Sequence, residues 1–299
     1  MTEQRNPASA GLDALPLEQA FDVLNAEDRK IADAVGRAKR EIVAAIRVVT
    51  EGLKGGGRLI YVGAGTSGRL GVIDAAECPP TFLSDPQTVQ GIIAGGDAAL
   101  KQSVEHFEDD PAAGAAEVDA RNVGPGDTVF GIATGGTTPF VHGALRRARA
   151  RGARTVFLAC VPQEEVADEA DVSIRVLTGP EVISGSTRLK AGVATKMVLN
   201  MVSTLAMVQL GKVYGDLMVD LNARGCAKLT DRAIRTTMAA TGLSRDQAGQ
   251  LLERADWHVK TAIVVHRLGV DGDEARRRLS AAEGHLRRVL AGAGKPPCA

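Results

Sequence analysis

Arg58-Leu-Ile-Tyr-Val-Gly-Ala-Gly-Thr-Ser-Gly-Arg69 is the stretch of sequence from which the fold of this chain follows. Its apolar part, 59–62, predicts a buried strand, and residues 69–78 have a helical composition. The glycine-rich turn between them leaves backbone N–H groups and two hydroxyls open to a ligand. Free N–H groups at the start of a helix form an anion site, so this turn is predicted to bind a phosphate. The predicted ligand-binding residues of the turn are Gly65, Thr66 and Ser67.

The same turn also matches the dinucleotide-binding fingerprint, because glycines stand at positions 63, 65 and 68. A dinucleotide fold needs an acidic residue about 20 residues further on, at the end of a second strand. Asp85 lies near that distance, but it falls in a segment after Pro79-Pro80 that is predicted to be a loop. The two adjacent hydroxyls of the turn suit a monophosphate better, so NAD or FAD is the less favoured ligand.

The composition excludes several other classes of protein. The 299 residues include 36 Lys+Arg, 36 Asp+Glu and only 3% aromatic residues, which argues against a nucleic-acid-binding surface. No run of 18 apolar residues predicts a membrane span, and the N-terminus has no apolar export segment. The cysteines are too scattered for a zinc site, so we expect a cytoplasmic protein without structural zinc. They are Cys78, Cys160, Cys226 and Cys298.

Strands and helices alternate through the middle of the chain. Helices are expected over 97–107 and 139–151, each following an apolar run. This alternation predicts an α/β fold with a parallel sheet and helices on both faces. Ligands of such sheets bind at the carboxyl ends of the strands. The further strands are predicted at 89–94, 128–133, 155–160 and 172–176.

Two more loops rich in glycine and hydroxyl groups fall at the same predicted edge of the sheet. Residues 134–139 follow a strand, and residues 184–192 precede a long apolar helix that runs to Leu210. A hydroxyl of Ser186 or Thr187 is expected to cap this helix. Capping explains any one such loop, but three on one sheet favour a small phosphorylated ligand. Its further ligand-binding residues are predicted to be Thr134, Gly136, Thr137, Thr138, Ser186, Thr187 and Lys190.

The two ends of the chain are predicted to lie outside the sheet. The first 16 residues are expected to form an extended arm, and apolar residues between 31 and 53 recur at the spacing of one helix. After Asn222 no strand pattern appears, and short helices are predicted at 243–254, 258–268 and 271–279. The predicted domains are an N-terminal arm and helix (1–54), the sheet domain (55–222) and a small all-α C-terminal domain (223–299).

One longer motif joins the glycine-rich turn to Asp74-Ala-Ala-Glu-Cys-Pro-Pro80. Together with further segments, this motif resembles the N-acetylmuramic acid 6-phosphate etherases over nearly the whole chain. The combination is specific to that family, well beyond a general sugar isomerase (SIS) domain. The further segments are Thr2-Glu-Gln-Arg-Asn6 and residues 93–96, 105–109, 185–192 and 212–220.

The resemblance implies an SIS-type fold and a lyase that needs no metal or cofactor. Such enzymes cleave the D-lactyl ether of N-acetylmuramic acid 6-phosphate, giving N-acetylglucosamine 6-phosphate and D-lactate in murein recycling. The C2 proton is removed, lactate leaves from C3, and water then adds. The family's two active-site glutamates fall on Glu77, as the acid, and Glu108, as the base. The family is dimeric with sites near the interface, so Glu77 is expected to act in its own or its partner's site.

Two carboxyl groups suit this chemistry because one must be ionised to take a proton while the other is protonated to give one. Without the family resemblance, the sequence would not assign these two glutamates to an active site. Glu77 lies near a helix end and Glu108 lies in an acidic cluster, and both settings are typical of solvated surfaces. One straight helix over 67–77 would place Glu77 about 15 Å from Ser67, further than a sugar phosphate reaches. Either the helix bends back, the phosphate is bound mainly by the second loop, or Glu77 serves the site of a partner subunit. Glu181, just before the third loop, remains a further candidate carboxylate.

The chain departs from the family pattern at Gly135, where many members have serine in the second loop. The loss of one charge-assisted hydrogen bond to phosphate would cost about 1.5–3 kcal/mol. Both glutamates are nevertheless present, which favours an active etherase. The first alternative is a non-catalytic sugar-phosphate-binding regulator on the same fold. The second is a sugar-phosphate isomerase, which has no need of an acid directed at C3.

Overall fold

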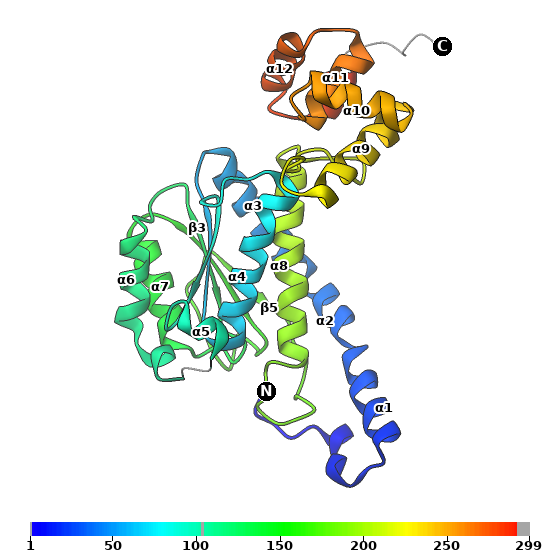
Figure 1. The fold of residues 1–299 in the computed structure, drawn as a ribbon. Helices are drawn as coiled ribbons and strands as arrows, with labels where there is room; N and C mark the ends of the chain where they lie inside the picture. Colours follow the sequence, from blue (N-terminus) through cyan, green and yellow to red (C-terminus); the bar gives the residue numbers. More distant parts are fainter. Residues whose placement is uncertain (1, 103–104, 292–299) are drawn as a thin grey trace. The chain divides into compact units, whose positions relative to one another are not determined.

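The computed structural model describes residues 2–102 and 105–291, which form two compact units (Figure 1). The first unit contains the residues up to Ala76 together with Gln87–Thr204. The second contains Glu77–Pro86 and the residues from Leu205 onward. Cys298 lies outside the described residues.

A five-stranded parallel sheet lies at the centre of the first unit, as the sequence predicts. Its strand order is β2-β1-β3-β4-β5, and Tyr61 of the second strand in this order pairs with Gly91 on one side and Phe130 on the other. Every residue of β1 and β3 is buried, as parallel strands covered on both faces require. The strands are β1 (Leu59–Gly63), β2 (Val89–Ile93), β3 (Thr128–Ile132), β4 (Arg154–Ala159) and β5 (Val172–Arg175).

Helices cover both faces of this sheet (Figure 1). α6 (Pro111–Ala120) and α7 (Pro139–Ala150) cover one face, and α6 has no counterpart among the helices that the sequence predicts. The other face carries α3 (Lys39–Lys54), α4 (Gly65–Phe82) and α8 (Lys190–Gln209). α4 packs closely because Gly71 has no side chain: a Cβ there would lie 2.8 Å from the Cβ of Tyr61.

The N-terminal segment is more structured than the extended arm that the sequence predicts. It forms two 3-10 helices, η1 (Pro7–Ser9) and η2 (Leu12–Ala14), and then α1 (Leu17–Asp28). The single helix expected over 31–53 is divided into α2 (Ile31–Arg37) and α3. At the junction the Ala38 N–H bonds to the carbonyl of Val35, three residues back, which is a tighter turn than an α-helix makes.

The helix predicted over 97–107 is wrong. α5 (Ala98–Lys101) ends after four residues, Gln102 is extended, and a second short segment, η3 (Glu105–Asp109), is a 3-10 helix. The carbonyls of Leu100 and Gln102 accept hydrogen bonds from the guanidinium of Arg69, at 3.2 and 2.8 Å. Hydrogen bonds from a distant side chain therefore occupy two carbonyls at the point where α5 ends.

α4 is longer than its composition predicts. It continues through Pro79 and Pro80 and ends at Phe82, although neither proline has an N–H group to bond to the preceding turn. Leu83 follows with a left-handed backbone (φ 49°), and its N–H bonds to the carbonyl of Pro79 at 2.9 Å. Asp85 lies in the loop after the helix, as predicted.

The second unit is helical, as predicted, and has its own apolar core. A short antiparallel pair that the sequence analysis did not predict, β6 (Val213–Tyr214) and β7 (Leu217–Met218), precedes its helices. Ser244 and Gln247 form a capping box at the start of α10. The helices are α9 (Ala227–Thr241), α10 (Arg245–Arg254), α11 (Val259–Leu268), α12 (Gly272–Ala281) and α13 (Leu286–Ala291).

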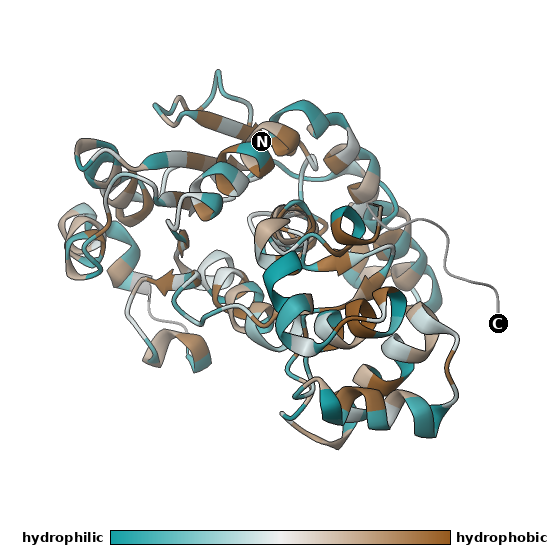
Figure 2. Cartoon of the chain, turned by 90° about the horizontal axis from the view of Figure 1, so that it is seen from above, coloured by the Kyte–Doolittle hydropathy of each residue, from teal (hydrophilic) through white to brown (hydrophobic). Residues whose placement is uncertain are grey.

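Most helices carry bands of apolar and hydrophilic residues, as expected for elements that bury one side (Figure 2). α8 is the one helix among the described residues that is long and apolar enough to cross a membrane by length and composition. Because 56% of the most apolar stretch of α8 is buried within the protein, its apolar character fits a core helix.

Candidate functional site

The first loop, residues 63–68, connects β1 to α4 at the carboxyl edge of the sheet. Its backbone is tightly folded: a Cβ at Gly63 would lie 2.6 Å from the Gly68 nitrogen. Gly65 is exposed in a left-handed conformation (φ 50°), which favours glycine. Thr66 is half-buried and Ser67 is buried in the first turn of α4. The predicted phosphate residues of this loop therefore lie at the start of a helix, where anions bind.

The second loop, residues 134–139, follows β3 on the same edge and leads into α7. Thr134 is buried, and its carbonyl accepts a hydrogen bond of 2.8 Å from the Cys160 N–H at the end of β4. Gly136 is buried with φ 87°, whereas Thr137 is exposed and Thr138 is half-buried. The second loop thus carries Thr137 and Thr138 on a backbone that is hydrogen-bonded to the end of β4.

His142 also holds the second loop, and sequence reasoning missed this residue. Its Nε2 lies 2.7 Å from the carbonyl oxygen of Gly136, so Nε2–H donates to that oxygen. The imidazole ring packs against Phe157, with ring centroids 5.1 Å apart. No sequence signal marks this role, because a histidine inside a helix has no motif of its own.

The third loop, residues 184–192, lies beside the first loop. A Cβ at Gly192 would be 3.6 Å from the Thr66 methyl group and 3.4 Å from the Thr187 carbonyl oxygen. The prediction that Ser186 or Thr187 caps the long helix is wrong. α8 begins at Lys190, and the carboxylate of Glu181 accepts from the backbone N–H groups of residues 190 and 191, each at 2.9 Å.

The Glu181 carboxylate caps α8 because a negative group is stabilised at the positive end of a helix, and Glu181 is fully buried there. Ser186 and Thr187 remain half-buried in the loop. Glu181 thus has a structural role that the sequence left open. Burial, followed by the charge of Glu181, raises the pKa of the Cys160 thiol to about 12, so this thiol stays protonated and is a poor nucleophile.

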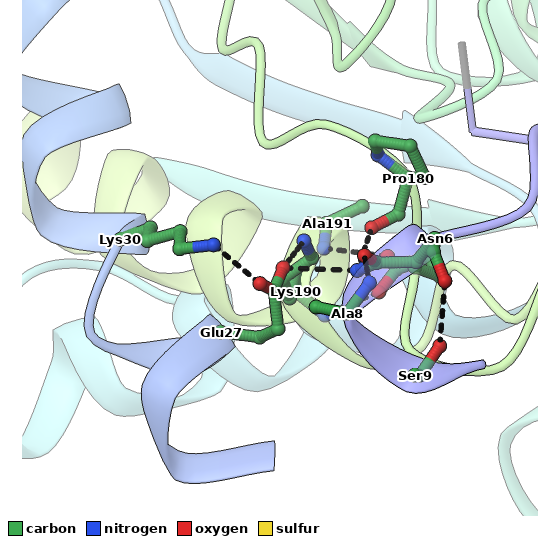
Figure 3. Close-up of polar contacts among 9 residues, drawn as sticks. Asn6, Ala8, Ser9, Glu27, Lys30, Pro180, Lys190 and Ala191 are labelled. Carbon is green, nitrogen blue, oxygen red and sulfur yellow. Dashed lines mark hydrogen bonds and ion pairs between the residues drawn. The ribbon is translucent and has the colours of Figure 1, made fainter. Parts of the chain in front are cut away.

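Lys190 belongs to a buried polar cluster beside the third loop (Figure 3). Its Nζ lies 2.6 Å from Oε2 of Glu27, and both side chains are almost inaccessible to solvent. Asn6 donates to the same oxygen at 2.9 Å and to the carbonyl of Pro180 at 3.1 Å. The ammonium of Lys190 is therefore bound to a carboxylate in this structure, and a contact between Lys190 and phosphate stays a prediction.

Charge and hydrogen bonding keep Glu27 ionised within this cluster. Burial alone would raise the pKa of its carboxyl group, but hydrogen bonds from Lys190, Lys30 and Asn6 outweigh burial. The result is a pKa lowered from 4.5 to about 2. The cluster therefore holds a charged carboxylate at neutral pH.

Glu108 lies on η3 and is exposed. η3 is positioned by its neighbour Phe107, whose ring would be 3.0 Å from a Cβ at Gly95. Gly95 follows directly after β2, the strand next to β1. The structure thus places the segment with Glu108 at the edge that carries the first loop.

Glu77 is exposed on α4, ten positions after Ser67 on the same helix. A rise of 1.5 Å per residue corresponds to about 15 Å along the helix axis. α4 is continuous from Ser67 to Glu77, so the long separation expected for one helix over 67–77 applies to these two residues. Glu77 belongs to the second compact unit, whereas the three loops and Glu108 belong to the first.

Asp74, one turn before Glu77, is a buried carboxyl group of the first unit. It accepts a hydrogen bond of 3.0 Å from the hydroxyl of Tyr61. Burial raises the pKa of Asp74, while hydrogen bonds from Ser203 and Tyr61 counteract part of that rise. The position of Asp74 shows that part of the long sequence motif is structural. Among the described residues, no group of three His, Cys, Asp or Glu side chains is placed to hold a metal.

Family models match three parts of the chain. The model of the glucokinase regulatory protein N-terminal SIS domain matches residues 41–149, and the SIS domain model matches residues 103–205. The model of the UBA-like domain matches residues 231–266 in the helical second unit. The SIS matches agree with the parallel sheet and flanking helices of the first unit.

Curated relatives match nearly the whole chain. An N-acetylmuramic acid 6-phosphate etherase from Trichormus variabilis is 54% identical over 97% of this chain and 94% of its own length. One from Gloeothece citriformis is 53% identical over 97% and 94%. A phosphoheptose isomerase structure from Neisseria gonorrhoeae, at 16% identity, covers 64% of this chain and 98% of its own, with a TM-score of 0.47. The two etherases, at this identity and coverage, show that the chain belongs to the N-acetylmuramic acid 6-phosphate etherase family, whose members are ether-cleaving lyases.

Proposed function

We propose that this protein cleaves the D-lactyl ether of N-acetylmuramic acid 6-phosphate to N-acetylglucosamine 6-phosphate and D-lactate. The reaction would take place in the cytoplasm, during the recycling of murein amino sugars. The observation that carries this proposal is the gathering of three polar loops at one edge of the sheet. Family membership, from the etherases at 54% and 53% identity, points to the same substrate.

The three loops would bind the phosphate group. The first turns of α4 and α7 supply backbone N–H groups and positive helix ends, which favour an anion. Hydroxyl groups on each loop add further donors, and no metal or cofactor is required. The proposed binding residues are Gly65, Thr66, Ser67, Thr134, Gly136, Thr137, Thr138, Ser186, Thr187 and Lys190.

The reaction would begin on the open-chain sugar, where the C1 aldehyde makes the C2 proton acidic. Glu108 would remove this proton, and the electron pair would form a C2–C3 double bond while the bond from C3 to the lactyl oxygen breaks. Glu77 would protonate the departing oxygen, so lactate leaves as an alcohol. Water would then add at C3, giving a proton back to Glu77, while Glu108 returns the proton to C2. Each proton transfer is expected to contribute about 10²–10⁴-fold to the rate.

A homodimer would fit the apolar faces that the single chain exposes. Val193 and Met201, which are 47% and 37% exposed, share one face of α8, and Leu17 and Phe21 share one face of α1. Exposed apolar faces of this kind mark protein–protein contacts. The distance along α4 between the first loop and Glu77 favours a site in which Glu77 comes from the partner subunit.

D-lactate release from N-acetylmuramic acid 6-phosphate tests the reaction. We expect release by the wild type, and a loss of about 10²–10⁴-fold in kcat for Glu77→Ala and for Glu108→Ala. Glu253→Ala is the matched control, because Glu253 is an exposed glutamate of α10. In ¹⁸O-labelled water the label should enter the sugar, since the C3–oxygen bond breaks. A wild type that binds the sugar phosphate without releasing lactate would favour the non-catalytic regulator.

A further inference from the structure

A cavity of about 520 Å³, lined by both polar and apolar residues, lies between the N-terminal arm and the third loop. The arm contributes Arg5, Ser9 and Asp13, and the third loop contributes Ser184. Both segments belong to the first compact unit. Of the described residues that line this cavity, Arg5 is the one cation. No step of the proposed reaction uses this cavity or the arm.

The arm is held in place on both sides of Arg5. Before it, the buried residue Thr2 accepts a hydrogen bond of 3.3 Å at its carbonyl from the Gly185 N–H of the third loop. After it, the amide of Asn6 donates to Glu27 and to the carbonyl of Pro180, at 2.9 and 3.1 Å (Figure 3). The backbone at Arg5 is therefore fixed next to the third loop.

The side chain of Arg5 is exposed, and its guanidinium has no ion-pair partner among the described residues. In contrast, the ammonium of Lys190, at the end of the same loop region, is bound to Glu27. Asp13 lines the same cavity, and within the described part of the chain it forms no ion pair with Arg5. A fixed backbone with an unpaired guanidinium over a cavity is a suitable place for a ligand carboxylate.

The cavity adjoins the third of the loops that would bind phosphate, and this loop lies beside the first. Ser184 lines it, and three residues later the Thr187 carbonyl oxygen would lie 3.4 Å from a Cβ at Gly192. The same Cβ would lie 3.6 Å from the methyl group of Thr66 in the first loop. Three residues of chain span at most about 11 Å, which is the scale of a sugar ring with its substituents. A ligand anchored by phosphate at the first loop can therefore extend into the cavity.

Because N-acetylmuramic acid 6-phosphate carries two anionic groups, its phosphate accounts for only one of the charges to be bound. We propose that Arg5 binds the second, the carboxylate of the lactyl group, and thereby distinguishes this substrate from sugar phosphates without that group. The guanidinium would form two parallel hydrogen bonds to the carboxylate. This assignment rests on the proposed function, since that function supplies the lactyl group.

Arg5→Met removes the charge and the hydrogen bonds while leaving the buried anchors at Thr2 and Asn6 intact. Two measurements are needed: the KM for N-acetylmuramic acid 6-phosphate, and the inhibition constant of N-acetylglucosamine 6-phosphate, which lacks the lactyl group. We expect KM to rise about 10–100-fold, as for the loss of a charge-assisted pair, and the inhibition constant to stay within about twofold. Arg5→Lys should recover part of the loss, because it keeps the charge without the two-pronged geometry.

Arg40→Met is the matched control, because Arg40 is an arginine with a 93% exposed side chain outside the cavity. An unchanged KM in Arg5→Met, or an equal rise in the inhibition constant, would overturn the assignment. The melting temperature of Arg5→Met should match that of the wild type, which excludes general unfolding.

If the wild type releases no lactate, the proposed reaction fails, and calorimetric binding of both sugar phosphates still tests Arg5. A wild-type preference for the muramic acid derivative that disappears in Arg5→Met would support the assignment. Equal binding of the two sugar phosphates by the wild type would refute it.

Discussion

The ammonium of Lys190 lies 2.6 Å from the carboxylate of Glu27, although 163 residues of sequence separate them. This ion pair connects the start of α8 to α1, and Asn6 joins it from the N-terminal arm. Only 2% and 5% of the two side chains are exposed. Removing one partner from such a pair leaves the other charge buried without compensation, which is costly.

Glu27→Gln should therefore lower the free energy of unfolding by about 3–5 kcal/mol. Lys190→Met should have a comparable effect, and the double variant should lose clearly less than the sum of the two, since it leaves no unpaired charge. Urea denaturation followed by circular dichroism measures all three. The exposed pair of Arg40 and Glu41 is the control, and Glu41→Gln should cost less than about 1 kcal/mol. Strict additivity would show that the pair is not coupled.

Acid should weaken the same pair in a defined pH range. Because the folded state lowers the pKa of Glu27 from 4.5 to about 2, the unfolded state binds the proton more readily. The stabilisation is fully present above about pH 4.5 and is lost as the pH falls through about 2, amounting to about 3 kcal/mol.

The measurement is the free energy of unfolding at pH 5.5 and pH 2.5 for the wild type and for Glu27→Gln. Other carboxyl groups titrate in both proteins, so the difference between the two proteins isolates Glu27. The wild type should lose more stability on acidification than the variant. Equal losses would mean that Glu27 does not titrate as the cluster requires.

The sheet and the loops at its edge were predictable because their signals are local. Apolar runs such as Leu59–Val62 predict buried strands, and glycine with hydroxyl residues after them predicts anion loops. Parallel order then brings the first and second loops to one edge. These features of the fold depend on patterns within about ten residues of each other.

The features that the sequence did not predict depend on partners far away in the chain. Lys190 stays a proposed phosphate ligand, but its buried carboxylate partner lies in α1, and no local pattern indicates that pairing. The helix over 97–107 is interrupted where Arg69, some 30 residues earlier, bonds to the carbonyls of Leu100 and Gln102. The Glu181 cap displaced two hydroxyl residues that were closer in sequence. For the 97–107 helix and the cap of α8, tertiary contacts overrode local preference.

Gly135→Ser should strengthen substrate binding. Gly135 is exposed, and a Cβ there would meet no atom within 4 Å, so a serine side chain fits without strain. One additional charge-assisted hydrogen bond to the phosphate is worth about 1.5–3 kcal/mol, so KM should fall by about tenfold or more. Gly249→Ser, at another glycine with open space, should leave KM unchanged. A KM that rises in Gly135→Ser would show that the second loop does not bind phosphate through this position.

Subunit complementation tests whether Glu77 acts in the partner's site. Glu77→Ala and Glu108→Ala subunits are unfolded together, refolded as a mixture, and assayed for lactate release. If each site takes Glu77 from one subunit and Glu108 from the other, a mixed dimer has one site with both glutamates and one with neither. Since about half of the dimers are mixed, the sample should recover about a quarter of wild-type activity.

The alternative arrangement gives a different result. If both glutamates of a site come from one chain, every site in the mixed dimer lacks one carboxyl group, and the mixture stays as inactive as its components. The position of Glu77 ten residues beyond Ser67 on α4 favours recovery. Light scattering of the refolded mixture must show dimers, because a monomer could not complement. Lost activity in a sample that is fully dimeric would place both glutamates in the same chain.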